Sequence, residues 1–384
     1  MKKEVLEAIA TLTGTTIGAG ILAIPYVVAK AGFLLGLIEI IVIGLAIVLL
    51  NLFMGEVVLR TDGNHQLTGY AEKYLGKNGK KVMSVFSITL LYGACIAYII
   101  GVGLSLSNIF PNLSAFWFSI IYFSLIAGVI YFGIAVVKNV ELFLSGATIF
   151  IVAAIAGILI FSRYFSYEKL NHFSGINPAN ILIPYGVILF AFLGAVAIPE
   201  MKEELVKNRK QLRKCIIIGT LIPLAVYALF AFAVVGVNGK DVSEVATISL
   251  GQLFGDNMLV FVNLFAVFAM TTSFLALGVA LKETYQYDYR LNKRTAWLLA
   301  CLIPIAAFLM GVKSFIGTLT IVGAIAGGAE GILIVLMHRR AKKMGGRKPE
   351  YSIGNNHVLN ISLIILFVLG VISQILVSMG IVHF

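Results

Sequence analysis

The chain has 384 residues, of which 60% are hydrophobic and only 12% are charged, and its formal net charge is +11. Because a soluble protein carries about a quarter charged residues, this composition excludes an ordinary soluble domain. The positive charge lies in short loops between apolar stretches, without the basic helix or aromatic-interleaved patch that binds nucleic acid. We therefore expect the lipid bilayer as a partner and no nucleic acid.

Eleven apolar segments recur along the chain, each long enough to cross the hydrocarbon core of a bilayer, which takes about 20 residues. The predicted spans cover residues 5–30, 33–59, 81–109, 114–135, 140–163, 179–204, 212–236, 257–284, 294–312, 314–337 and 357–382. No polar stretch is long enough for a separate soluble domain. Residues 1–384 are therefore predicted to form a single all-α polytopic membrane domain.

The lysines and arginines test this topology, because cytoplasmic loops of membrane proteins carry an excess of them. With the N-terminus inside, 24 of the 29 basic residues fall on the cytoplasmic side and 5 fall outside. A missed or invented span would reverse the side of every later loop. We therefore expect a multi-pass protein of the cell (plasma) membrane with a cytoplasmic N-terminus and, since the number of spans is odd, an external C-terminus.

Two of the loops are predicted to contain helices. Residues 65–76 have helical spacing and are expected to lie along the cytoplasmic surface. Residues 240–256 are expected to form an outer loop with a short helix.

Residue types that build active sites or metal centres inside a membrane are scarce in the predicted spans. All five histidines and all four aspartates lie in loops or at span ends, and no lysine or arginine falls in mid-span. Cys95, Cys215 and Cys301 lie in apolar segments without disulfide or metal spacing, so we interpret them as core residues. This pattern argues against an enzyme, a cofactor or a metal other than a coupling Na⁺. Glu56 and Glu330 are candidate proton or gate carboxylates.

The first predicted span is interrupted at its centre. Gly14, Gly18 and Gly20 stand among threonines, and Pro25 removes a backbone donor from the turn before it. In transporters, broken backbone at membrane depth lines a cavity and exposes N–H groups and carbonyls that bind substrate and ions. The spacing from Gly14 to Gly18 is also a common helix-packing motif, so span 1 alone leaves both interpretations open.

A second interruption lies five spans later and therefore in inverted orientation. Span 6 places Gly194 and Ala195 shortly before an Ala-Ile-Pro sequence that also follows the glycines of span 1. Paired breaks at corresponding positions of two halves point to the binding site of a transporter. The pair therefore favours function over packing.

Span 8 carries three adjacent hydroxyls, Thr271, Thr272 and Ser273. Such hydroxyls commonly bond back to their own helix. Next to the broken carbonyls of span 1, they would instead complete an oxygen cage for Na⁺, because hard cations prefer these ligands.

The sequence around these breaks resembles a known family. Gly14 to Ile21, followed by Ile24-Pro25, resembles the first span of amino acid permeases in the APC superfamily. Phe190 to Gly194 resembles their aromatic-x-Phe-x-Gly segment in span 6. Tyr98 with its neighbours, and Thr272 to Leu275, are similar to the hydroxy/aromatic amino acid permease branch, with the amino acid/auxin permease branch close by.

The resemblance covers nearly the whole chain and implies a LeuT-type fold. Two inverted repeats of five helices would cover residues 1–163 and 164–337, with broken helices 1 and 6, and residues 357–382 would add an eleventh helix. It further implies a secondary active transporter, a cation-coupled symporter of neutral, hydrophobic or aromatic amino acids that works by alternating access. We expect it to act as a monomer. The alternative is a channel or a non-transporting, ligand-sensing membrane subunit on the same fold.

By position, the resemblance also assigns binding residues. The substrate residues would be Thr16, Gly18, Ala19, Gly20, Tyr98, Phe190 and Gly194. The N–H groups of Ala19 and Gly20 would hold the substrate carboxylate, and carbonyls of Thr16 and around Gly194 would hold its ammonium. The cation site would comprise Gly14, Ile17, Thr272 and Ser273, with Thr271 as the one-residue alternative.

Two further points concern the coupling ion and the gate. Glu56 matches a family glutamate linked to the inner gate. Proton-coupled relatives can carry a lysine in span 5, which residues 140–163 lack. This leaves open Na⁺ at the hydroxyl site or H⁺ at a carboxylate such as Glu330.

Overall fold

The computed structural model describes residues 3–63, 65–132, 141–171, 184–354 and 356–378, which are almost entirely helical. The α-helices are α1 (Lys3–Thr16), α2 (Gly20–Ala31), α3 (Phe33–Leu59), α4 (Leu67–Ile109), α5 (Ala115–Phe132), α6 (Glu141–Ile160), α8 (Tyr185–Phe192), α9 (Ile198–Glu204), α10 (Leu212–Asn238), α11 (Ala246–Phe254), α12 (Asp256–Glu283), α13 (Lys293–Leu309), α14 (Phe315–Ile321), α15 (Gly328–Met344) and α16 (His357–Ser378). Shorter 3-10 or π-helical turns are η1 (Tyr167–Leu170), η2 (Ala195–Ala197), η3 (Arg209–Gln211), η4 (Thr284–Asp288) and η5 (Val322–Gly327).

The described helices confirm an all-α polytopic membrane protein. Within the described residues, 8 helical segments are long and apolar enough to cross a membrane, and the bent pair α1 and α2 makes 9. The remaining two predicted spans fall on α13 and on α6, whose described apolar part is Gly146–Ile160. The predicted span ends at 133–135, 140, 179–183 and 379–382 lie outside the described residues.

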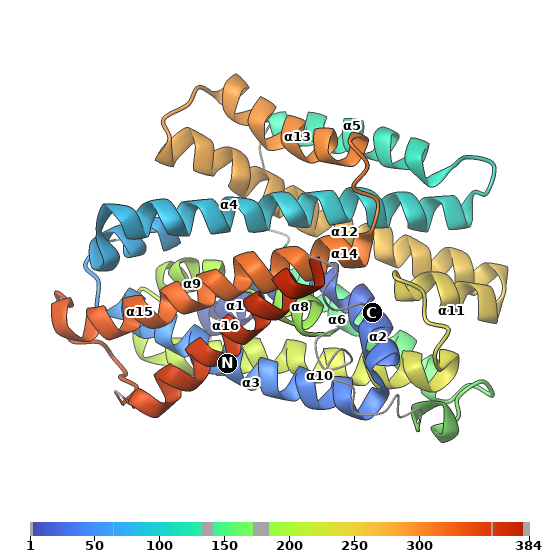
Figure 1. The fold of residues 1–384 in the computed structure, drawn as a ribbon, viewed down its shortest axis with the longest axis horizontal. Coiled ribbons are helices and arrows are strands. Elements are labelled where there is room, and N and C mark those ends of the chain that lie inside the picture. Colours follow the sequence, from blue (N-terminus) through green and yellow to red (C-terminus); the bar gives the residue numbers. More distant parts are fainter. Residues whose placement is uncertain (1–2, 64, 133–140, 172–183, 355, 379–384) are drawn as a thin grey trace.

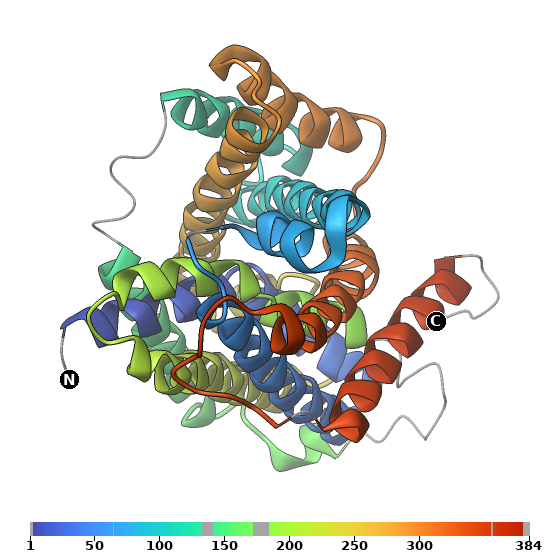
Figure 2. The same cartoon turned by 90° about the vertical axis from the view of Figure 1, so that its left-hand side faces the viewer.

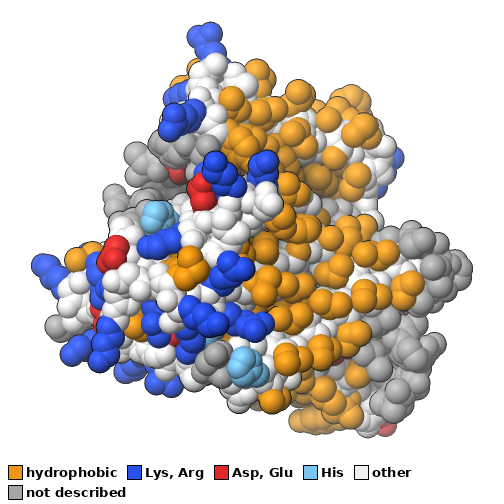
Figure 3. All heavy atoms as spheres, turned by 60° about the vertical axis from the view of Figure 1, so that its left-hand side comes forward, with side chains coloured by type: hydrophobic (Ala, Val, Ile, Leu, Met, Phe, Trp, Pro, Cys, Tyr) orange, Lys and Arg blue, Asp and Glu red, His pale blue; other side chains and the backbone are white. Residues whose placement is uncertain are grey.

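The surface is divided in the way that a bilayer requires. Hydrophobic side chains form a broad band across the face shown in Figure 3, and lysines and arginines gather at one end. We call this the basic end; it includes the loops that carry Arg60, Lys207 and Arg347. Cys95, Cys215 and Cys301 are free and buried, as predicted.

The helices form two groups (Figures 1 and 2). α4, α5, α12 and α13 pack against one another in a group that we call the frame, whereas α1, α2, α3, α8, α9 and α10 form the bundle. α15 contacts both α4 of the frame and α3 of the bundle, and α16 packs against α15. The functional site lies where the two groups meet.

Both predicted loop helices are present. α4 begins at Leu67 and is kinked at Gly76, whose φ of 76° is a conformation that glycine adopts without a Cβ clash. The turns before Gly76 form a short helix at the basic end, seen folded back at the left of α4 in Figure 1. α11 occupies the predicted outer loop and packs against α12.

The turn η5 lies in backbone contact with the bundle and close to the frame. A Cβ added to Gly323 would lie 2.0 Å from the carbonyl oxygen of Gly186 in α8, and one added to Gly186 would lie 2.3 Å from the Thr320 carbonyl oxygen. From the frame, a Cβ on Gly93 would lie 2.1 Å from a methyl carbon of Val322. η5 is a π-helical turn, a rare conformation that is common at functional sites.

The division into inverted repeats at 1–163 and 164–337, with 357–382 as an addition, stays a prediction. α16 occupies the position in the sequence of the additional helix.

Candidate functional site

The first predicted span is broken at its centre. α1 ends at Thr16, α2 begins at Gly20, and the two helices are bent by 53°. A Cβ on Gly18 would lie 3.0 Å from the hydroxyl oxygen of Tyr98 and 3.1 Å from that of Ser273. Glycine at this position therefore lets hydroxyls of two frame helices, α4 and α12, approach the break.

The sixth predicted span is also broken, and its break faces the first. α8 ends at Phe192, the backbone is extended at Leu193, and η2 and α9 then resume the helix. A Cβ on Gly194 would lie 2.6 Å from the Oγ1 of Thr16, and one on Gly20 would lie 2.4 Å from the Cβ of Ala191. The structure thus confirms that the two breaks lie against each other, in contact too close for larger side chains.

Tyr227 of α10 joins the two breaks. Its hydroxyl lies 2.8 Å from the carbonyl oxygens of both Thr16 and Ala191, and its one proton is shared between these two acceptors. The side chain is fully buried, and its ring packs edge-on against Phe192 with 5.1 Å between ring centroids. Helix ends leave carbonyls without intrahelical partners, and this hydroxyl offers a shared donor to one such group in each span.

Tyr227 was not among the residues predicted from the sequence. A single tyrosine in an apolar span forms no recognisable pattern with its neighbours. The sequence indicated only that a phenol buried there would need a hydrogen-bond partner. The bond also alters one expectation, since the Thr16 carbonyl accepts from Tyr227 and, at 3.1 Å, from the Gly18 N–H. That carbonyl is therefore not free for a substrate ammonium.

A cavity of about 80 Å³ lies between the bundle and the frame. Both breaks line its bundle side, and of the predicted substrate residues, Thr16, Gly18, Gly20, Tyr98, Phe190 and Gly194 line it. Ala19 does not line the cavity but is fully buried between two residues that do.

One face of α4 forms the frame side of the cavity. Ser87, Leu91, Ala94 and Tyr98 follow one another at steps of four, three and four residues, which places them on one side of a helix. Leu67, the first residue of the short helix at the basic end, also lines the cavity. The cavity therefore extends from the breaks towards the basic end.

The three predicted cation-site hydroxyls of α12 differ in their partners. Thr271 donates to the Val267 carbonyl at 2.6 Å, and Thr272 donates to the Ala269 carbonyl at 3.0 Å. Both hydroxyls thus bond back to their own helix. Ser273 instead interacts with the hydroxyl of Tyr98, beside the first break.

The two other predicted cation ligands lie on span 1. Gly14 is within α1, and Ile17 follows the last residue of that helix and is buried. Among the described residues, no hydrogen bond joins either of them to α12. The structure therefore brings Ser273 to the break and leaves the rest of the cation site a prediction.

Glu330 is the carboxylate that lines the cavity. Its side chain is buried, and the Ser87 hydroxyl, also in the cavity wall, lies 3.4 Å from its Oε2. The other predicted carboxylate, Glu56, does not line the cavity. Of the two candidate proton or gate carboxylates, the structure thus places Glu330 alone in the cavity wall.

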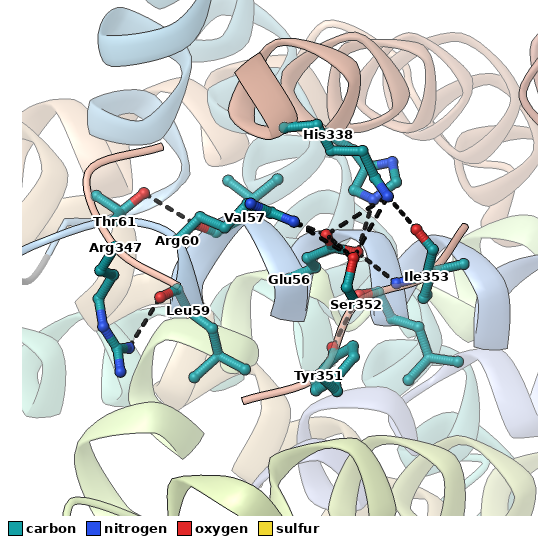
Figure 4. Close-up of polar contacts among 12 residues, drawn as sticks. Glu56, Val57, Leu59, Arg60, Thr61, His338, Arg347, Tyr351, Ser352 and Ile353 are labelled. Atoms are coloured by element: carbon teal, nitrogen blue, oxygen red, sulfur yellow. Dashed lines mark hydrogen bonds and ion pairs between the residues drawn. The ribbon is translucent and has the colours of Figure 1, made fainter. Parts of the chain in front are cut away.

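Glu56 is the centre of a buried polar cluster at the basic end (Figure 4). Its carboxylate lies 2.8 Å from Nε of Arg60, 3.0 Å from Nε2 of His338 and 3.6 Å from Nζ of Lys342. The Ser352 hydroxyl at 2.8 Å and the Ile353 N–H at 2.7 Å complete its partners in the described part of the chain. The carboxylate is fully buried and holds the connection between α15 and α16.

His338 differs from its expected position at a span end. α15 continues to Met344, so His338 lies inside this helix and is fully buried. Its ring stacks on Phe53 with 4.0 Å between centroids. The histidine therefore fixes α15 to α3 near their ends.

The segment 345–354, which follows α15 and which we call the strap, makes further bonds to α3. Arg347 donates to the Leu59 carbonyl and Tyr351 donates to the Leu52 carbonyl, each at 2.8 Å. Burial raises the pKa of the Tyr351 phenol well above its usual range, so this group stays a neutral donor. The strap is therefore hydrogen-bonded to the last turns of α3 at the basic end.

Comparison with known proteins gives a consistent family. A family model described as the tryptophan/tyrosine permease family matches residues 1–376. Tyrosine-specific transport system 1 of Haemophilus influenzae is 26% identical over 94% of this chain and 93% of its own. Glutamine transporter 2 of Aliivibrio fischeri is 26% identical over 82% and 83%, and the tryptophan-specific transport protein of Shigella flexneri is 22% identical over 96% and 93%.

A solved structure supports the fold independently. Mhp1, described as a nucleobase-cation-symport-1 family transporter in a closed conformation with bromovinylhydantoin bound, matches with a TM-score of 0.63. The match covers 97% of this chain and 90% of that one at 13% identity, so it bears on the fold alone. It confirms the LeuT-type fold with broken helices 1 and 6.

Proposed function

The chain belongs to the tryptophan/tyrosine permease family, and from this premise we propose that it is a cation-coupled symporter of neutral, mainly aromatic amino acids. The observation that supports this most directly is that a single cavity is lined by both helix breaks and by Tyr98 and Phe190. Transporters bind substrate and coupling ion at such breaks because these expose unpaired backbone groups in the middle of the membrane.

The amino acid backbone would bind at the breaks. The N–H groups of Ala19 and Gly20 begin α2, where the helix dipole favours a carboxylate. The ammonium would contact main-chain carbonyls around Gly194, since the Thr16 carbonyl already accepts two hydrogen bonds. The side chain would extend past Phe190 towards the apolar wall that includes Leu91.

The substrate class follows from the relatives and from the wall chemistry. The relatives are named for tyrosine, tryptophan and glutamine, all neutral at pH 7. Leucines and alanines make up much of the cavity wall, and Phe190 and Tyr98 offer aromatic faces for a substrate ring.

A monovalent cation would drive uptake. For Na⁺, the ligands would be Ser273 with the carbonyls of Gly14 and Ile17, supported by the position of Ser273 beside the first break. For H⁺, the acceptor would be a carboxylate in the cavity, which Glu330 provides.

Alternating access would move the bundle relative to the frame. The cavity extends to the basic end, and basic loops face the cytoplasm, so this conformation would be open to the inside. We propose that the protein works as a monomer in the plasma membrane, with its N-terminus in the cytoplasm and its C-terminus outside.

Uptake into proteoliposomes tests the proposal. Purified protein would be offered labelled tyrosine, tryptophan, glutamine, phenylalanine and leucine under separate Na⁺ and pH gradients. We expect saturable accumulation that requires one of the two gradients. Binding of these amino acids without accumulation under either gradient would favour a ligand-sensing subunit and overturn the transporter.

A further inference from the structure

Glu330 is a carboxylate in the wall of an otherwise largely apolar cavity. It is 3% exposed, and Ser87, at 3.4 Å from Oε2, is the hydrogen-bond partner found for it among the described residues. A buried carboxylate with a single distant partner has acceptor capacity to spare. Leaving such a group without a donor costs free energy, so a donor supplied by a ligand would bind well there.

The packing of span 10 points Glu330 at the cavity. On one side of the helix, a Cβ on Gly331 would lie 2.7 Å from the ring of Phe367, so this side lies directly against α16. Gly327, one turn before Glu330, faces the cavity residue Leu193, since its added Cβ would lie 2.6 Å from the Leu193 Cδ1. Glu330 and Gly327 are three residues apart and so share this face.

The Glu330 carboxylate also lies at a depth that the side chain of a bound substrate could reach. Leu193 marks the break of span 6, and three residues of α-helix rise about 4.5 Å, so Glu330 lies roughly one turn from the break towards the basic end. Gly20 at the first break and Glu330 line the same cavity. An amino acid whose carboxylate is at α2 would direct its side chain along this path.

We propose that Glu330, with Ser87, forms a side-chain subsite that accepts a hydrogen bond from the substrate. The subsite would select neutral amino acids whose side chain ends in a donor, such as a phenol O–H, an indole N–H or an amide N–H. Phenylalanine and leucine would fill the apolar part but offer the carboxylate no donor beyond Ser87. This inference rests on the proposed function and assigns its specificity to one pair of residues.

The ratio of kcat/KM for tyrosine over phenylalanine measures the effect of the subsite, because these two substrates differ by one hydroxyl. In proteoliposomes, we expect wild-type uptake of tyrosine to exceed that of phenylalanine in kcat/KM by roughly tenfold or more, as for a hydrogen bond to a charged group. Glu330→Met removes both acceptors at similar length and should reduce this ratio to near one, chiefly through the KM for tyrosine. Glu330→Gln keeps one acceptor and should retain part of the preference.

Glu39→Met provides the matched control. Glu39 is another glutamate in a predicted span, but it does not line the cavity, so this variant should keep the wild-type ratio. Ser87→Ala should change the ratio less than Glu330→Met. A wild-type chain that transports phenylalanine as well as tyrosine would overturn the subsite while leaving the transporter intact.

Two other results would also reject the subsite. If Glu330→Met lowered the transport of all amino acids equally, the ratio of kcat/KM for tyrosine over phenylalanine would be preserved. Glu330 would then be assigned to ion coupling instead. Preferred uptake of lysine over tyrosine would show that the carboxylate pairs with a cationic side chain. Absence of any uptake by the wild-type chain would instead count against the proposed function itself, so the two failures are distinguishable.

Discussion

The hydroxyl of Tyr227 lies 2.8 Å from the carbonyl oxygen of Thr16, the last residue of α1, and makes an equal contact with Ala191 in α8. One side chain on an unbroken helix therefore connects both broken helices. The two breaks are held at a fixed separation by a third element, which itself runs unbroken through the bundle.

Tyr227→Phe removes this connection while keeping the ring. We expect uptake to fall at least several-fold and the protein to lose about 1–3 kcal/mol of stability, because two buried carbonyls lose the donor that they share. Thermal unfolding in detergent and uptake kinetics would measure both effects. Tyr185→Phe is the control, since the Tyr185 hydroxyl contacts the Leu366 carbonyl at 3.3 Å, away from the breaks. Equal effects of the two substitutions would contradict a specific role for Tyr227.

Gly18→Ala tests the close approach of the frame to the first break. The added methyl would lie 3.0 Å from the Tyr98 hydroxyl and 3.1 Å from the Ser273 hydroxyl, so these groups must move. We expect uptake to be lost although the protein still folds. Gly128→Ala in α5 meets nothing within 4 Å and should transport normally, because alanine favours a helix. Normal transport by the Gly18 variant would show that this contact is dispensable.

Ser273→Ala tests the cation site. If Na⁺ is the coupling ion, loss of the hydroxyl at the break should abolish stimulation of uptake by Na⁺. Ser124→Ala removes a hydroxyl of the frame that bonds back to Ile120 in α5, and it should leave the Na⁺ response unchanged. Uptake would be measured across a range of Na⁺ concentrations at fixed pH. The site is rejected by a variant whose Na⁺ dependence matches that of the wild type.

Glu56→Ala tests the buried cluster at the basic end. The substitution leaves His338 and Arg60 without their carboxylate partner and frees the strap at Ile353. Breaking a buried pair costs roughly 3–5 kcal/mol, so a large decrease in Tm and faster proteolysis of the strap are expected.

An exposed ion pair provides the comparison for Glu56. Glu72 pairs with Lys80 at 2.8 Å, with both side chains well exposed, so Glu72→Ala should cost at most about 1 kcal/mol. If the two variants unfolded at the same temperature, Glu56 would not anchor the strap.

The sequence predicted the features that depend on composition or on an interrupted pattern. Gly18 and Gly194 were identifiable because glycines and a following proline contradict an otherwise continuous apolar span. The short helix before Gly76 was identifiable because residues 65–76 have helical spacing. Such signals are local and need no knowledge of the packing.

Features that depend on pairs of distant residues were not predictable in this way. Tyr227 gains its meaning from Thr16, 211 positions away, and Ser87 from Glu330, 243 positions away. The hydroxyl run of span 8 predicted Thr272 and Ser273 as ligands with Thr271 as the alternative, and the rotation of α12 turns Ser273 towards the break. Glu56 and Glu330 were both candidate proton or gate carboxylates, and in the structure one is bonded to the strap and the other faces the cavity.

The contact of Gly186 with Gly323 has a mechanical consequence. Where two helices meet through side chains, relative movement must reorganise interlocked rotamers, whereas here main chain lies on main chain. Few side chains therefore stand between η5 and α8 at this contact. A shift of span 10 along the bundle would require few rotamer changes there, so we expect this contact to offer little resistance when the bundle moves relative to the frame.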